Sequence, residues 1–135
     1  MLSLFQRRSP KQKLFDCARK GKERHVRKII ESGVPVDILD SRGRSPLCVA
    51  SKYGMLEVME VLAELGADVN IKGRQNKTPI YYAIGSGSLA AVELLIRLGA
   101  KQDVHDDGGF TPFTYARALS RSKIVEALKL QGVES

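Results

Sequence analysis

The sequence repeats with a period of 33 residues, and this period limits the folds open to the chain more than any other feature. Glycines recur at this spacing, at Gly33, Gly66, Gly99 and Gly132. We call positions that are 33 residues apart a column. Three other columns hold apolar or small residues: Leu14, Leu47, Ile80 and Phe113; Cys17, Ala50, Ala83 and Ala116; Ile29, Leu62, Leu95 and Leu128. A regular period of this length predicts a solenoid, in which each unit packs only on its neighbours. Four copies of one unit would display a long surface rather than an enclosed pocket.

The second copy shows how each unit is built. Residues 45–46 are Ser-Pro, a typical helix start because the hydroxyl accepts a free backbone N–H and proline suits the first helical position. Gly54 predicts the end of this short helix, and Gly66 the end of a second helix with an apolar stripe. Residues 67–76 then combine alternating apolar residues with turn-forming ones. We therefore expect two helices and one hairpin-like projection per unit.

This pattern resembles the ankyrin repeat: Ser/Thr-Pro-Leu-x-x-Ala-x-x-x-Gly, a Val/Leu-rich helix, Leu-Gly-Ala-Asp-Val-Asn and a turn. Residues 45–71 match it closely, 78–104 well and 111–132 in part, whereas 12–38 keep its second half but lack the Thr-Pro opening. The resemblance implies an all-α repeat solenoid of four stacked helix-turn-helix repeats with short β-hairpin-like fingers. We expect a basic arm at residues 1–11 and a repeat domain at 12–135. Its repeats would span about 12–44, 45–77, 78–110 and 111–135, the first and last acting as caps of a complete stack.

Two departures from the family pattern concern stability. The histidine that usually follows Thr-Pro-Leu is replaced by Cys48, Tyr81 and Thr114, so its hydrogen bonds to neighbouring hairpins must be missing or replaced. We expect a somewhat less stable stack for this reason. Residues 85–87, Gly-Ser-Gly, weaken a helix, since glycine costs about 1 kcal/mol relative to alanine in a helix interior. They predict a soft first helix in the third unit, unless the glycines allow close contact with a neighbour.

The net charge of +7 is concentrated at the start of the chain. Residues 1–30 contain ten Lys and Arg against two acidic residues, whereas the rest carries twelve against thirteen. Cys17 and Cys48 are expected to be buried thiols in a reducing compartment. No stretch approaches the ~18 apolar residues that span a bilayer, and the first eight residues lack the apolar run of a secretory signal. We therefore expect a cytoplasmic protein.

Nothing in the sequence nominates an enzyme, a cofactor or a metal site. His25 lies between arginines and is expected on a solvated surface. His105 is followed by two aspartates, but three adjacent residues on a loop tip do not define a coordination sphere. No phosphate-binding loop or activated nucleophile is present in the pattern. We expect a non-enzymatic protein.

The resemblance implies that a partner protein binds the fingers and the exposed positions of the first helices, which together line the concave face. By column, these positions are Arg19, Lys20, Leu39, Arg42, Arg44, Lys52, Tyr53, Lys72, Arg74, Lys77, His105, Asp107, Phe110 and Leu119. The first two fingers are basic and the third is acidic, so the partner is expected to carry an acidic patch opposite the N-terminal half. Tyr53 is expected to anchor the partner, because aromatic and arginine residues dominate binding hot spots. We expect a monomer acting as an inhibitor, an immunity protein or a scaffold.

Two alternatives remain open from the sequence. The basic segment 1–30 is a candidate nucleic-acid-binding region, which would show a steep dependence of affinity on salt. It contains only two aromatic residues, Phe5 and Phe15, and the latter is expected in the core. A short membrane-surface anchor built from Leu2, Leu4 and Phe5 is the weaker alternative, because one turn of apolar surface binds lipid marginally.

Overall fold

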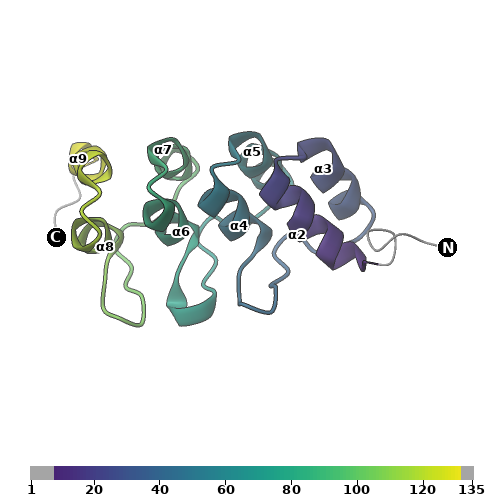
Figure 1. Cartoon of the computed structure of the whole chain (residues 1–135), viewed down its shortest axis with the longest axis horizontal. Coiled ribbons are helices and arrows are strands. Elements are labelled where there is room, and N and C mark those ends of the chain that lie inside the picture. Colours follow the sequence, from purple (N-terminus) through teal and green to yellow (C-terminus); the bar gives the residue numbers. More distant parts are fainter. Residues whose placement is uncertain (1–7, 132–135) are drawn as a thin grey trace.

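The computed structural model describes residues 8–131, and within them the chain forms a row of four helix pairs with loops projecting from one side (Figure 1). Second helices form one layer, first helices the next, and the fingers extend below them. The pairs are α2 (Pro10–Lys20) with α3 (Glu23–Glu31), α4 (Pro46–Tyr53) with α5 (Leu56–Glu64), α6 (Pro79–Ser86) with α7 (Leu89–Arg97), and α8 (Pro112–Ala118) with α9 (Ser122–Leu130). The expected all-α repeat solenoid is confirmed.

The expected helix starts and stops are present, with two exceptions. The Ser45 hydroxyl accepts the Cys48 N–H at 3.2 Å, and Thr111 does the same for Thr114 at 3.1 Å. Thr78 makes no such bond, and its buried hydroxyl has no partner among the described residues. Ser120 replaces glycine at the end of α8 and adopts the left-handed conformation itself, at φ 57°.

The first repeat opens differently from the sequence-based prediction. We expected no hydroxyl–proline start there, but Ser9 and Pro10 provide one a turn earlier than in the other copies. The Ser9 hydroxyl accepts the Gln12 N–H at 3.2 Å, and the Gln12 side chain accepts the Ser9 N–H at 2.9 Å. This reciprocal capping box stabilises a first helix of 11 residues. The helix begins two residues before the expected start of the repeat domain.

The core runs along the whole stack, because the columns of Leu47 and of Ala50 contribute a buried residue to every repeat. Ala50, Ala83 and Ala116 are fully buried between successive first helices, where their small side chains allow close packing. Cys17 occupies the same column and is also buried. Both cysteines are free thiols, and burial raises the pKa of each. Within residues 8–131, no helix is long and apolar enough to cross a membrane.

The glycine-rich end of α6 is held by an arginine from the next repeat. The Arg121 guanidinium donates to the Gly85 carbonyl at 2.6 Å and to the Ile84 carbonyl at 3.2 Å. The Ile84 carbonyl also accepts the Gly87 N–H at 3.0 Å, whereas Arg121 supplies the donor for the Gly85 carbonyl at this helix C-terminus, where a cation is also electrostatically favoured. The predicted soft helix therefore has a built-in support, since a residue 36 positions away replaces the missing local contacts.

Candidate functional site

The fingers are tight turns rather than two-stranded hairpins, since no strand is present within residues 8–131. In the first finger (residues 39–44), Asp40 accepts the N–H groups of Arg42 and Arg44, both at 2.9 Å. In the third finger (residues 105–110), Asp106 accepts those of Gly108 and Phe110, again at 2.9 Å. An aspartate at the same repeat position thus shapes both fingers from inside.

The second finger (residues 72–77) has Gly73 at that position, and close approach to its neighbour requires a glycine there. A Cβ on Gly73 would collide with the Gly43 carbonyl oxygen. That same carbonyl accepts the Arg74 N–H at 3.1 Å, so backbone hydrogen bonding joins the first and second fingers. The Asp107 N–H donates to the Gln75 carbonyl at 2.9 Å and joins the second finger to the third. The fingers therefore form one connected row.

Tyr81 replaces the hydrogen bonding of the missing family histidine in the third repeat. Its buried hydroxyl donates to the Phe110 carbonyl at 2.5 Å and lies 3.3 Å from the Val104 carbonyl. Burial, followed by the nearby Asp106 carboxylate, raises the pKa of Tyr81 well above its ordinary value. The hydroxyl therefore stays protonated, and it links α6 to the third finger.

A hollow of about 300 Å³ lies between the first finger and the helices α2 and α4. We call it the arginine hollow. Three arginines and an acidic residue line it together with apolar and aromatic side chains: Arg19, Arg42, Arg44, Asp16, Phe15, Val49 and Tyr53. It combines first-helix and finger residues in one surface, as the family resemblance implied.

A second hollow of about 180 Å³, the tyrosine hollow, lies farther along the first helices, beside α4, α6 and α8. Its lining residues are Lys52, Lys77, Tyr81, Tyr82, Gly85, Ser86 and Tyr115. The Lys77 ammonium lies 5.0 Å from the centre of the Tyr115 ring, a cation–π distance. Tyr115 also packs edge-on against Tyr81 and Phe110, with ring centres 5.4 and 6.0 Å away. Burial raises the pKa of Tyr82 as well.

Six of the predicted site residues line these two hollows: Arg19, Arg42, Arg44, Tyr53, Lys52 and Lys77. Lys20, Leu39, Lys72, Arg74, His105, Phe110 and Leu119 lie on the exposed surface outside them. Arg44 is half-buried and bonded through Nε to Asp40 at 3.0 Å, so it also shapes the finger. Asp107 accepts a hydrogen bond from the Asn76 amide at 2.9 Å, which gives this predicted contact residue a structural role too.

One further column of the repeat contributes to both hollows and was not predicted from the sequence. Asp16, Val49, Tyr82 and Tyr115 follow one another at intervals of 33 residues, and each lines one of the hollows. Their chemistry differs from copy to copy, so the column carries no shared residue type, but the period alone would have found it. Phe15, expected in the core, is half-buried and lines the arginine hollow.

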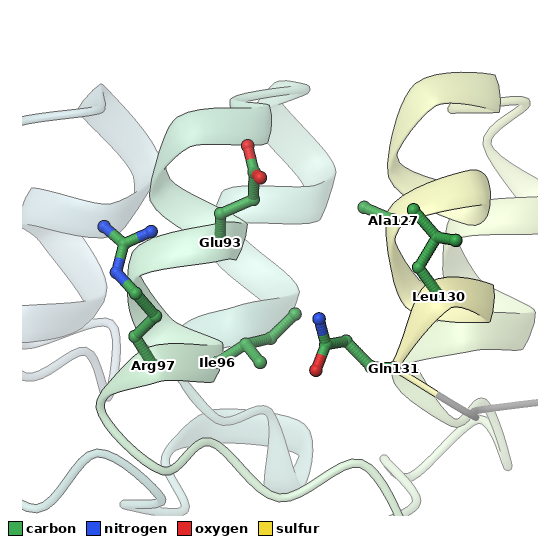
Figure 2. A pocket seen from close by; sticks show the side chains of 6 residues that line it. All are labelled: Glu93, Ile96, Arg97, Ala127, Leu130 and Gln131. Carbon is green, nitrogen blue, oxygen red and sulfur yellow. The ribbon is translucent and has the colours of Figure 1, made fainter.

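A third hollow lies on another face, between the second helices α7 and α9 (Figure 2). It has a volume of about 370 Å³ and is lined by Glu93, Ile96, Arg97, Ala127, Leu130 and Gln131. Ala127 stands where the second and third repeats have the buried Val61 and Leu94, and the smaller side chain leaves this space open. None of the predicted site residues lines it.

No cluster of histidine, cysteine and acidic side chains suited to a metal ion occurs in residues 8–131. His25 and His105 are both exposed. Several cations of the basic N-terminal segment are engaged: Arg19 pairs with Asp16 at 2.9 Å, and Arg27 with Glu64 at 2.6 Å. Arg8 forms a further ion pair with Asp16.

Two family models of ankyrin repeats match the sequence. One describes many copies of the repeat and matches residues 29–83, and the other describes three copies and matches residues 66–134. A search of curated proteins finds no match. Because the second model alone covers just over half of the chain, this protein belongs to the ankyrin repeat family. Ankyrin repeats generally serve as protein–protein interaction modules and are typically non-enzymatic.

Proposed function

We propose that this protein binds an acidic protein partner through the face formed by its first helices and its first two fingers. The observation that supports this most strongly is the arginine hollow, where finger and first-helix residues meet around Tyr53. Tyr53 is 45 % exposed, so its ring is available to a partner and suits a binding anchor.

The charges of this face also fit an acidic partner. Arg42, Lys72 and Arg74 are exposed, and none forms an ion pair with a residue between 8 and 131. Because the fingers bearing them are joined by backbone hydrogen bonds, the cations have fixed points of attachment. A preorganised surface loses less entropy on binding than a mobile one. Charges at the edge of such a face govern the association rate and its salt dependence more than the final affinity.

The test is a charge reversal on this face with a matched reversal elsewhere. The face variant carries Arg42→Glu, Lys72→Glu and Arg74→Glu, and it spares Arg44 because that side chain shapes the first finger. The control variant carries Arg24→Glu, Arg97→Glu and Lys123→Glu, three exposed cations on second helices. Both variants lower the net charge of the protein by the same amount. We expect unchanged helical circular dichroism for both.

Proteins captured from a native lysate by the wild-type chain and by each variant would be compared by mass spectrometry. The proposal requires a protein that the wild type and the control retain and the face variant loses, with capture that weakens as salt increases. A partner that the face variant retains and the control loses would reject it. The alternative, nucleic-acid binding through residues 1–30, predicts a salt-sensitive complex in a gel shift and no such difference between the variants.

A further inference from the structure

We propose that the arginine hollow takes a phosphorylated side chain of the protein partner. This inference rests on the proposed function, because it names the group that would bind at one end of the proposed face. Guanidinium groups suit phosphate because their planar fork donates two parallel hydrogen bonds to its oxygens. Three guanidinium groups, those of Arg19, Arg42 and Arg44, line this one hollow.

Two of these guanidinium groups are oriented by carboxylates and retain unused donors. Asp40 accepts from the Nε of Arg44 at 3.0 Å, and Asp16 accepts from Nη2 of Arg19 at 2.9 Å. Both terminal nitrogens of Arg44, and Nε and Nη1 of Arg19, have no hydrogen-bond partner among residues 8–131. The carboxylates therefore hold the two arginines in place without using up their donors.

Arg42 supplies the third guanidinium, which pairs with no carboxylate in the described chain. Its backbone N–H is bonded to Asp40, so the side chain projects from a fixed point on the first finger. Asp16 is the one acidic residue in the lining. It forms ion pairs with Arg8 and Arg19, so its negative charge is compensated. In and around the hollow, four guanidinium groups face two carboxylates: Arg8, Arg19, Arg42 and Arg44 against Asp16 and Asp40. The excess of two positive charges matches the charge of a phosphoryl group better than that of one carboxylate.

The remaining walls are apolar, and this favours a phosphoryl group carried on an aromatic ring. Phe15 is half-buried, Val49 is buried and Tyr53 is exposed at the rim. The volume of about 300 Å³ lies at the lower end of the range for ligand pockets and suits one side chain rather than a larger ligand. Among phosphorylated residues, phosphotyrosine would use both the arginines and the aromatic walls, and phosphoserine only the arginines.

The experiment is an NMR titration of the whole chain with phenyl phosphate, following backbone amides and arginine Nε–Hε signals. We expect shifts at Arg19, Arg42 and Arg44, and weaker or no shifts with benzoate, which has the ring but a single carboxylate. Arg42→Ala should weaken phenyl phosphate binding roughly tenfold, because it removes charge-assisted hydrogen bonds. Arg97→Ala, an exposed arginine on α7, should leave it unchanged. Equal affinity of Arg42→Ala and wild type, or equal binding of benzoate, would overturn the proposal.

Peptides with a single phosphotyrosine or phosphoserine then distinguish the two carriers, and tighter binding of phosphotyrosine is expected. Inorganic phosphate should bind more weakly than phenyl phosphate, since it lacks the ring. The titration needs no partner, so its failure is distinguishable from failure of the proposed function. If phenyl phosphate shifts none of the three arginines while the charge-reversed face loses the partner, only the phosphate inference is wrong.

Discussion

Replacing Tyr81 by phenylalanine isolates one hydrogen bond between a helix and a finger. The Tyr81 hydroxyl donates to the Phe110 carbonyl at 2.5 Å from a side chain that is 1 % exposed. The variant keeps the ring and its packing against Tyr115, so only the hydroxyl is lost. The Phe110 carbonyl would still accept the Asp106 N–H at 3.0 Å and would not be left unpaired. We therefore expect the loss of one net hydrogen bond, about 1 kcal/mol of unfolding free energy.

In a chain of this size, that loss corresponds to a fall of ~4 °C in the midpoint of thermal unfolding. Urea unfolding gives the free energy, and hydrogen exchange should show faster exchange of the Gly108 and Phe110 amides in the third finger. Tyr82→Phe is the matched control, because no hydrogen bond joins that hydroxyl to a residue between 8 and 131. It should change the stability by less than ~0.5 kcal/mol. Equal stability of Tyr81→Phe and wild type would refute a structural role for this hydroxyl.

The pH dependence of the unfolding free energy gives a second, independent test of the buried Tyr81 hydroxyl. Burial raises the pKa of Tyr81 in the folded protein, whereas in the unfolded chain it lies near the ordinary value of about 10. Above pH 10 the unfolded chain therefore releases a proton that the folded protein retains, and the folded state loses stability as the pH rises. Phenylalanine removes this term. The stability difference between wild type and Tyr81→Phe should accordingly narrow above pH 10, and a constant difference would contradict the assigned burial.

Three further substitutions test how the repeats are joined and capped. Gly73→Ala places a Cβ against the Gly43 carbonyl, so it should cost about 1–3 kcal/mol in urea unfolding and accelerate amide exchange where the first two fingers meet. Asp37→Asn keeps an acceptor for the Asp68 N–H but removes a carboxylate whose pKa is raised by burial and by the Asp68 charge. It should therefore slightly stabilise the protein at pH 7, and the gain should vanish in thermal unfolding at pH 3, where Asp37 is protonated. Ser120→Gly relieves a left-handed backbone at φ 57° and should raise the unfolding free energy by about 1 kcal/mol in urea unfolding; an unchanged or lower free energy would contradict this strain.

The repeat period was enough to predict the fold because every repeat packs only on its neighbours. Equivalent positions such as Ala50 and Ala83 lie in the same environment in successive repeats. The repeated pattern therefore indicates which residues pack together, although they are far apart in the sequence. The first repeat was predicted less well, since its hydroxyl–proline start lies three residues before the column position. The hairpin-like fingers form without strands in residues 8–131 for a physical reason. Aspartate side chains and single backbone bonds between neighbouring fingers satisfy the N–H groups that a hairpin ladder would pair.

The candidate site was predicted in part, because resemblance gives positions but not pairings. Arg19 and Arg42 were expected at the surface by column, and they line the arginine hollow. That Asp40 holds Arg44 from within the same finger depends on side-chain geometry that no spacing rule contains. The support of Gly85 by Arg121 was missed for the same reason, since it joins residues 36 positions apart.

The arrangement of the fingers links stability to recognition in a way that can be separated experimentally. The backbone bond from Arg74 to Gly43 sets the spacing between the first two fingers, whereas the side chains of Arg42 and Arg74 carry the charges. A substitution of either side chain should therefore change partner affinity at nearly constant stability. Gly73→Ala leaves both charges in place and alters their spacing, so a loss of partner affinity larger than the loss of folded protein would show that the geometry of the row, and not its charge alone, is recognised.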